Sequence, residues 1–438
     1  MRLVAALLFM GLVFAGCTGE TDELVDTDGD GIPDTPKSQV PKTPPPQPPA
    51  LELSFRAAVD LGTRAYPAAF GTSCQDSLDD GDCGLGEPSV EVDSAGTIYV
   101  TGVCCIGSAP PVLVSRDGGA TFQDLAGDEV RELFGIEADL AIDALGRLYV
   151  ADIEFAGTFQ VTVWEADGSY VRHMKWPAPP LVDRDWIRAE GDGILYYVYN
   201  TGTNTNVYKS TDGGMTWSPT WIHQTGFGLG NAAIWPGHEL CIVGGGGGIQ
   251  MQCSRDGGTS FDSVSHQMPT GGGFPVPVFD EAGNLYVATG GGMAIHVAHR
   301  PVGNQTWQPA VQVSPPGQHH MPWIAGGRNG SAAVAWYGTL DENVTASTEW
   351  FLFVGASLDA TAADPTWTWA IADPEPILTG SFGRQLLDFL QVDMGPDGAI
   401  HVAYSRADGS GPDGNEERLV YVRTEPTLLA MQDFWLGP

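Results

Sequence analysis

A short segment recurs along this chain and limits the folds that are open to it. Each copy has an apolar-rich run, an Asp, a turn containing Gly, and a second apolar or aromatic run, as in Val92-Asp-Ser-Ala-Gly-Thr-Ile-Tyr-Val100. Asp and Gly suit tight turns, so each copy predicts a β-hairpin. The other copies lie at 142–150, 189–198, 235–243, 279–287, 325–336 and 392–402.

The spacing of the hairpins indicates an all-β fold built from repeated sheets. Copies recur every ~40 to 65 residues, which is typical of the four-stranded antiparallel blades of a β-propeller. The seven copies predict seven blades; six blades with one irregular insertion is the alternative. Residues 51–59 can supply the outer strand of the last blade beside 418–424, which would remove free sheet edges.

Three repeats end in a sharper motif, Ser-x-Asp-x-Gly-x-Thr-aromatic, with Ser in the Thr position of the third copy. The motif resembles the Asp-box, or bacterial neuraminidase repeat, of sialidase-like propellers. The resemblance implies a turn between the third and fourth strands, on the face away from the family's active site, and a structural role for each motif residue. These residues are Ser115, Asp117, Gly119, Thr121, Phe122, Ser210, Asp212, Gly214, Thr216, Trp217, Ser254, Asp256, Gly258, Ser260 and Phe261. A degenerate copy lies at 303–307.

The first residues predict export. Arg2 precedes an apolar run, 3–14, which ends in Ala-Gly-Cys17 and is too short to span a bilayer as a helix. The small residues before the cysteine resemble a bacterial lipobox, which implies cleavage after residue 16 and acylation of Cys17. We therefore expect a protein of the cell envelope, held by lipid to the outer membrane or cell surface; plain secretion is the alternative.

Residues 17–50 are expected to form a tether before the propeller of residues 51–438. Its second half, 36–50, is rich in proline and favours an extended spacer. Its first half has alternating carboxylates that resemble the calcium repeats of thrombospondin type 3 stalks, although Lys37 replaces the glutamate that closes an EF-hand. The predicted calcium ligands are Asp26, Asp28, Asp30 and Asp34; a solvated acidic linker is the alternative.

Six cysteines follow Cys17, an even number that favours disulfides in an exported chain. Cys241 and Cys253 lie on two strand-like runs joined by a glycine-rich turn, so we predict a cross-strand disulfide between them. Spacing does not define the partners of Cys74, Cys83, Cys104 and Cys105, for which a zinc site is the alternative.

The charge balance narrows the class of partner. Acidic residues number 54 against 20 basic ones, for a formal net charge of −34. Such a chain repels a phosphate backbone, which excludes nucleic acid as a partner. We expect a monomer that meets a glycan or protein ligand at a face of the propeller and the membrane only through its lipid.

Resemblance to sialidases implies a site over the central channel, where arginines clamp the sugar carboxylate and a tyrosine acts as nucleophile. Arg184 and Arg384 would form the clamp, and Asp183 or Asp185 would be the acid/base. The candidate nucleophiles, at the ends of second strands, are Tyr199, Tyr337 and Tyr404. The chain lacks the family's Arg-Ile-Pro motif and a third well-placed arginine, since Arg328 falls in a turn on the other face.

Structural roles are the competing interpretation of these residues. Arg184 could pair with a neighbouring aspartate, Trp186 and Trp323 could pack between blades, and His319 and His320 could be exposed loop residues or a paired-histidine metal site. Fold analogy alone does not fix activity. We therefore predict a recognition module for glycans or proteins, with a sialidase-type glycosidase and an assembly scaffold for an envelope complex as the alternatives.

Overall fold

The structure is a computed structural model. It describes residues 24–25, 35–36, 51–62, 64–65, 82–83, 85–104, 110–125, 137–154, 157–178, 182–201, 204–224, 231–245, 249–263, 275–328, 330–383, 386, 388–407 and 417–425. Contacts divide the chain into Met1–Ala50 and Leu51–Pro438. In the first unit, β1 (Leu24–Val25) pairs with β2 (Thr35–Pro36). The predicted signal peptide, Cys17, Cys74, Cys105 and the aspartates between these two strands lie outside the described residues.

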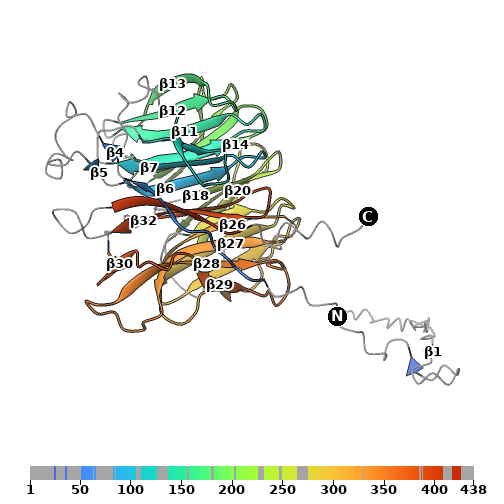
Figure 1. Ribbon diagram of the computed structural model, residues 1–438. Helices are drawn as coiled ribbons and strands as arrows, with labels where there is room; N and C mark the ends of the chain where they lie inside the picture. The colour runs from blue at the N-terminus through green and yellow to red at the C-terminus, as the bar shows by residue number, and fades with distance from the viewer. Residues whose placement is uncertain are drawn as a thin grey trace, which may run out of the picture. The chain divides into compact units, whose positions relative to one another are not determined.

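The second unit is a seven-bladed propeller of four-stranded antiparallel blades (Figure 1). Blade one consists of β6 (Leu85–Val92), β7 (Ile98–Cys104), β8 (Leu113–Ser115) and β9 (Gln123–Asp124). Blade two consists of β10 (Ala138–Ile142), β11 (Leu148–Glu154), β12 (Thr158–Trp164) and β13 (Tyr170–Pro177). Blade three consists of β14 (Val182–Glu190), β15 (Ile194–Thr201), β16 (Asn204–Ser210) and β17 (Ser218–Gln224). Blade four consists of β18 (Asn231–Trp235), β19 (Glu239–Gly245), β20 (Ile249–Ser254) and β21 (Asp262–Ser263). Blade five consists of β22 (Val276–Phe279), β23 (Leu285–Gly292), β24 (Ile295–Arg300) and β25 (Val311–Gln312).

Blade six is β26 (Gln318–Gly326), β27 (Ala332–Thr339), β28 (Glu349–Ser357) and β29 (Thr368–Ile371), with β30 (Leu378–Thr379) also paired to β28. The end of β23 pairs with β26, which joins the sheets of blades five and six. A short pair, β4 (Arg64–Ala65) and β5 (Asp82–Cys83), lies outside the blades. No helix in the described part of the chain is long and apolar enough to cross a membrane.

The seventh blade closes the ring with strands from both ends of the unit. It consists of β31 (Gln391–Met394), β32 (Ile400–Ala407), β33 (Glu417–Arg423) and the N-terminal β3 (Val59–Gly62). The predicted closure is therefore confirmed. Ser54 and Arg56 form backbone hydrogen bonds with Glu425 and Arg423, Phe55 forms a bridge with Thr424, and β3 continues the pairing from Val59 to Gly62. The seven-bladed prediction holds and the six-bladed alternative is wrong.

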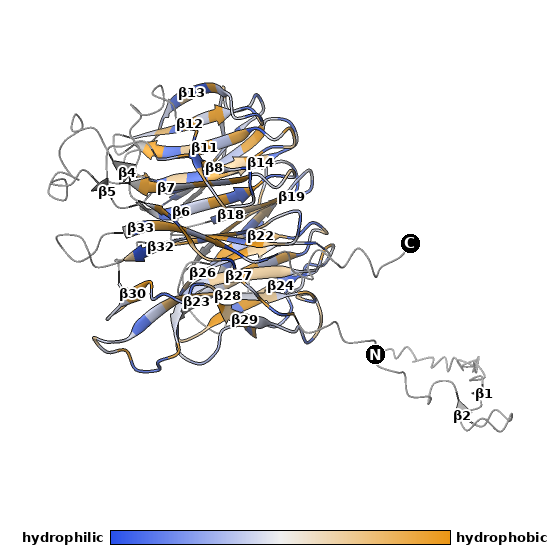
Figure 2. Cartoon of the chain, in the orientation of Figure 1, coloured by the Kyte–Doolittle hydropathy of each residue, from blue (hydrophilic) through white to orange (hydrophobic). Residues whose placement is uncertain are grey.

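The repeated hairpins connect the first and second strands of a blade, as predicted. In blade two, Asp143 Oδ1 accepts the backbone N–H groups of Leu145 and Arg147, and Gly146 has a φ of 79°. An aspartate before a left-handed glycine satisfies the turn's donors while the chain reverses. Apolar side chains of the paired strands are buried between neighbouring blades, and hydrophobic residues concentrate along these strands (Figure 2).

The Asp boxes form the predicted turns between third and fourth strands. In blade three, Asp212 accepts the backbone N–H of Thr216 at 2.9 Å and its hydroxyl at 2.6 Å, while Ser210 accepts the N–H of Gly214. The motif's Trp217 packs on Phe159 of blade two with ring centroids 5.8 Å apart. The boxes of blades one and four repeat these hydrogen bonds.

Both kinds of turn lie on one face of the propeller, which we call the turn face. The backbone N–H of Gly213, in the Asp box, donates to the carbonyl of Gly193, in the hairpin turn of the same blade. The degenerate copy is also a turn, since Asn304 accepts the N–H of Thr306. Blade six has a further turn of this kind that the sequence motif did not reveal. In it Asp359 accepts the backbone N–H of Thr366, seven residues later, whereas the other boxes bond the residue four positions later.

The predicted disulfide is present between Cys241 of β19 and Cys253 of β20, which are directly opposite in the strand register. Both cysteines are buried in the packing between blades four and five. The side chains of Cys83 and Cys104 are not described, so the pairing of the remaining four cysteines stays open.

Candidate functional site: the two ends of the channel

The inner strands of three blades begin with a bulge at the channel end opposite the turn face, which we call the mouth. Glu87, Arg184 and Met321 have φ values of 45°, 60° and 54°, and each lies at a register shift with the second strand of its blade. A left-handed conformation is costly for residues other than glycine and is retained where surrounding structure holds it. The sequence predicted residues 183–186 and 319–320 in loops before the inner strands. The structure instead places them within β14 and β26.

Three aromatic rings, which we call the plug, fill the mouth. The centroid of Trp186 lies 5.3 Å from that of Trp323 and 5.4 Å from that of Phe389, and the latter two are 5.6 Å apart. Trp186 belongs to blade three and Trp323 to blade six, so they pack across the channel and not between neighbouring blades as expected. The cavity that remains beside the plug has a volume of only about 10 Å³.

Arg184 lies against the plug and is buried. Its Nη2 is 2.5 Å from Oδ2 of Asp388, and its guanidinium lies 5.7 Å from the ring centroid of Phe389. Asp388 precedes β31, so this ion pair links blade three to blade seven. Asp388 lies far from Arg184 in the sequence, and the side chain of Asp183, one of the two partners that the sequence offered, is not described. A guanidinium engaged in this way presents no open clamp for a sugar carboxylate.

Among the described residues, the three candidate tyrosines do not line the cavity at the mouth. Tyr199, Tyr337 and Tyr404 are fully buried in blades three, six and seven. Tyr337 accepts the backbone N–H of Ser405, and Tyr404 donates to Asp373. Arg384 lies outside the described residues, as does the side chain of Asp183.

Asp185 belongs to a cluster that the sequence did not suggest. Its Oδ2 accepts the hydroxyl of Tyr197 at 2.6 Å, and its backbone N–H donates to Glu137 at 3.0 Å. Glu137 in turn donates its backbone N–H to Asp152, and all three acids are buried. Burial raises the pKa of Asp185 to about 7, and burial with the nearby charge of Asp185 raises that of Asp152. The group therefore places a carboxyl with a raised pKa beside a tyrosine hydroxyl.

A polar layer crosses the channel below this cluster. Asp139 Oδ1 accepts from Ser89 and Gln391, and its Oδ2 accepts from Arg188 at 2.7 Å. Arg188 also donates to Asn231 and to the carbonyl of Ala232. This layer ties the inner strands of blades one, two, three, four and seven together.

The two adjacent histidines are structural. His319 is fully buried, and its Nδ1 accepts from Trp336 at 3.0 Å while its Nε2 lies 2.9 Å from the carbonyl of Pro315. His320 stacks on Phe382 with centroids 4.5 Å apart. Both ring nitrogens of His319 are engaged, so the expected exposed loop and the paired-histidine metal site are both wrong.

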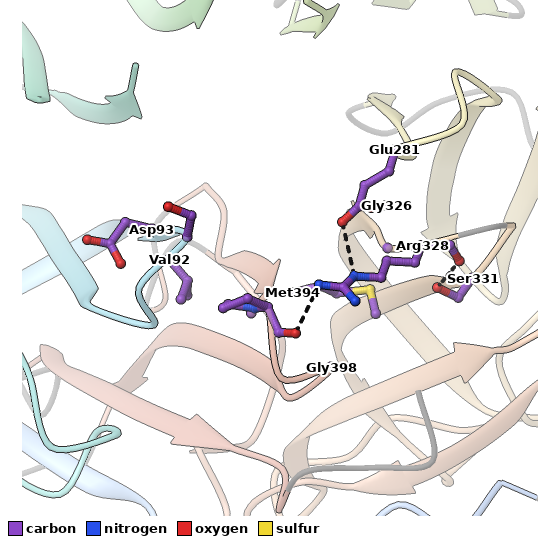
Figure 3. Close-up of a pocket in the computed structure, with 12 residues that line it drawn as sticks. Val92, Asp93, Glu281, Gly326, Arg328, Ser331, Met394 and Gly398 are labelled. Atoms are coloured by element: carbon purple, nitrogen blue, oxygen red, sulfur yellow. Dashed lines mark hydrogen bonds and ion pairs between the residues drawn. The ribbon is translucent and has the colours of Figure 1, made fainter. Parts of the chain in front are cut away.

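The turn face, in contrast, has an open cavity of about 300 Å³ at the channel end. Blades five, six, seven and one line it, and Figure 3 shows Asp93 on one side with Glu281 and Arg328 on the other. Arg328 lies 3.4 Å from Glu281 and donates to the carbonyl of Pro396 at 3.3 Å. Val92, Ser94, Gly326, Gly327, Ser331, Met394, Gly395 and Gly398 complete the lining. We call this the turn-face cavity.

Comparison with solved structures supports the fold. A fungal alcohol oxidase of the AA5 family, in complex with copper, shares 13% identity and a TM-score of 0.51, over 85% of this chain and 76% of its own. The structure of Ycf48 bound to D1 peptide shares 15% identity with this chain at a TM-score of 0.48, and the match covers 88% of this chain and 97% of that one. A NanB sialidase mutant from Streptococcus pneumoniae shares 12% identity at a TM-score of 0.43, and the match covers 83% of this chain and 70% of that one. No family model and no curated protein matches the chain.

Sequence reasoning missed the residues that define both channel ends. Phe389 and Asp388 directly precede the seventh inner strand, a position already singled out in blades three and six, so the same rule could have found them. Glu137 and Tyr197 carry no sequence signal of their own, because their proximity depends on the packing of blade two on blade three.

Proposed function

We propose that this protein is an exported, lipid-anchored propeller that recognises glycans or proteins and does not hydrolyse them. One observation carries the proposal: the mouth, where a sialidase-like enzyme would take its substrate, is filled by the plug and by the Arg184–Asp388 pair. A ligand site usually needs a cavity of roughly 300 Å³ or more. Among the described residues, the mouth has a cavity of about 10 Å³ and the turn face one of about 300 Å³.

Hydrolysis assays test this proposal directly. The full chain is incubated with a fluorogenic sialoside and a panel of other aryl glycosides, beside binding measurements on glycan and envelope-protein arrays. Specific binding without turnover supports a recognition module. Turnover of any substrate, lost on substitution of the responsible side chain, contradicts it.

A glycosidase is the second candidate, and the Asp185–Tyr197 hydrogen bond favours it. A carboxyl with a pKa near 7 can act as a general acid, and it lies 2.6 Å from a hydroxyl that could act as nucleophile. Asp185→Asn and Tyr197→Phe are the variants that would abolish turnover. Asp212→Asn is their control, because Asp212 belongs to an Asp-box turn on the opposite face.

Anchoring is a separate part of the proposal and rests on the lipobox alone. Cells expressing the full chain and its Cys17→Ser variant are labelled with an alkyne fatty acid. Labelling and membrane recovery of the parent, with loss of both in the variant, support the lipid anchor. Equal behaviour of the two chains would instead indicate plain secretion.

A further inference from the structure

We propose that the free edge of β13, the outer strand of blade two, binds an acidic and extended segment of a partner protein, which pairs with β13 as an added strand. This inference rests on the proposed recognition function and names a surface and a class of partner for it. The surface lies on the rim of the propeller, so it involves neither the mouth nor the turn-face cavity.

The outer edge of blade two is long. β13 has eight residues and β17 of blade three has seven, whereas β9, β21, β25, β29 and β3, the outer strands of the other blades, have two to four. Among the described residues, no strand pairs with the outer side of β13, which Figure 1 shows at the periphery of the propeller. Its outward N–H and C=O groups can therefore pair with another strand.

The strand is regular and is held in place by blade three. Its pairing with β12 is continuous over residues 172–177, and the register shifts only near its start. Trp176 packs on Trp217 of blade three with ring centroids 5.9 Å apart. Arg172 donates to the carbonyl of Gly213, also in blade three. An edge that is already fixed loses little conformational freedom when a further strand pairs with it.

The charge of β13 determines which partner fits. The strand contains Arg172 and Lys175 and no Asp or Glu, and no other strand that the structure describes carries more than one net positive charge. It is thus a basic edge on a chain whose formal net charge is −34. Such an edge repels the same edge of a second copy and attracts an acidic segment.

The nearest acids in the sequence lie before the strand and do not interrupt it. Glu165 and Asp167 belong to the turn between β12 and β13, at the turn-face end of the blade. Arg116 of blade one lies against this turn and donates to the carbonyl of Asp167 at 3.3 Å. The attraction for an acidic segment is therefore concentrated on the regular part of β13, residues 172–177.

Exposed side chains on β13 define the pattern that the partner should have. Tyr170 and Met174 are 41% and 36% exposed, and Lys175 is exposed as well. Neighbours in a strand point to opposite faces, so Met174 and Lys175 lie on different sides of the edge. A segment that alternates carboxylates with β-branched residues can place one set beside Lys175 and the other beside Met174.

Matched peptides test this pairing in calorimetric titrations of the full chain. The probe is an octapeptide, capped at both ends, in which Glu alternates with Val. One counterpart has Lys in place of every Glu. Another keeps every Glu and replaces the two central Val residues with Pro, which cannot donate to a strand ladder. We expect the probe to bind about tenfold more tightly than either counterpart.

Hydrogen exchange and one substitution then locate the bound peptide. The probe should protect the backbone amides of β13 and leave those of β17 unchanged. Lys175→Glu reverses a charge at an exposed position and should weaken binding about tenfold. Arg328→Glu is the control, because it changes the net charge by the same amount on the turn face of blade six. It should leave the affinity unchanged.

Several results would overturn the inference: equal binding of the three peptides, protection of a strand other than β13, or unchanged affinity in Lys175→Glu. Dimers of the full chain in sedimentation velocity that Lys175→Glu abolishes would also overturn it, because the occupant would then be a second copy. If arrays show specific ligands and the probe does not bind, the inference fails while the recognition function stands. If glycosides turn over, the proposed function itself fails.

Discussion

The two ends of the channel are held together in different ways. At the mouth, the Arg184–Asp388 pair joins residues 204 positions apart, and the plug joins blades three, six and seven. At the turn face, the Asp box of blade three closes within four residues, as when Asp212 accepts from Thr216. The mouth is held by contacts between distant blades. The turn face is held by local turns and by hydrogen bonds between neighbouring blades, such as that from the Gly330 N–H to Asp280.

This difference determines what each end can do. Packing across the channel closes the mouth, because rings from opposite blades meet there. The turns form hydrogen bonds within themselves and with the neighbouring blade, as when the Gly193 N–H donates to Asp143, and a cavity of about 300 Å³ lies between them. In the described part of the chain, the end with the strongest long-range contacts therefore has a cavity of only about 10 Å³, against about 300 Å³ at the turn face.

Removal of one ring of the plug should give the largest loss of stability. Trp323 is 6% exposed and contacts both other rings. Trp323→Ala should lower the free energy of unfolding by ~3 to 5 kcal/mol, because a large cavity is left in a packed site. Equilibrium unfolding in urea measures the change.

Trp369→Ala is the control for that measurement. Trp369 lies on the outer strand β29 with 40% of its surface exposed. Its loss should cost far less than that of Trp323. Similar losses for the two variants would mean that the plug does not brace the ring, and the contrast between the two ends would fail.

Breaking the ion pair at the mouth should cause the next largest loss of stability. Arg184→Met leaves Asp388 buried without its charged partner and should cost about 3 kcal/mol. The double variant Arg184→Met, Asp388→Leu removes both charges and should recover most of that loss. Thermal unfolding of the three chains tests this; a double variant no more stable than the single one would show that the pair is not the source of the effect.

The same contrast explains how much could be predicted from the sequence. The hairpins, the Asp boxes and the Cys241–Cys253 bridge are set by residues close together in the chain, so their spacing was sufficient for the prediction. The closure by β3 was predictable because it needs only a strand at each end. The position of β3, four residues long, was less certain because nothing local marks its start.

The candidate site could not be predicted in the same way. Arg184 was singled out correctly as a residue of the channel mouth, but its partner is fixed by how blade seven docks on blade three. The bulges that turn Trp186 and Trp323 into the channel have no glycine to mark them, since Arg184 and Met321 take the left-handed conformation. A cavity depends on how the blades are arranged in space, so a pattern of residues in the sequence does not predict it.

The two ends should respond to pH in opposite directions. Burial raises the pKa of Asp185 to about 7, above its value in the unfolded chain. The native state therefore binds the extra proton, and this contribution to stability falls as pH rises from about 4 to 7. Asp185→Asn should remove that slope and make the variant more stable than the parent at pH 8.

At the turn face, the contribution of an Asp box to stability should change with pH in the opposite direction. The hydroxyl of Thr121 donates to Asp117 and, with its backbone N–H, lowers the pKa of that carboxyl to about 2. Its contribution is present above pH 4 and is lost as pH falls toward 2. Melting temperatures measured from pH 3 to 9 should therefore pass through a maximum near pH 5; a parent curve that rises steadily to pH 8 would contradict the assignment at Asp185.

The smallest effect is expected from a single Asp box. Asp212→Ala removes an exposed turn's acceptor, and water can replace it at the N–H of Thr216, so the loss should be about 1 kcal/mol. Asp212→Asn, which keeps one acceptor oxygen, should lose less. A loss as large as that of Trp323→Ala would mean that these turns brace the ring as the plug does, and that the open end is held by more than local structure.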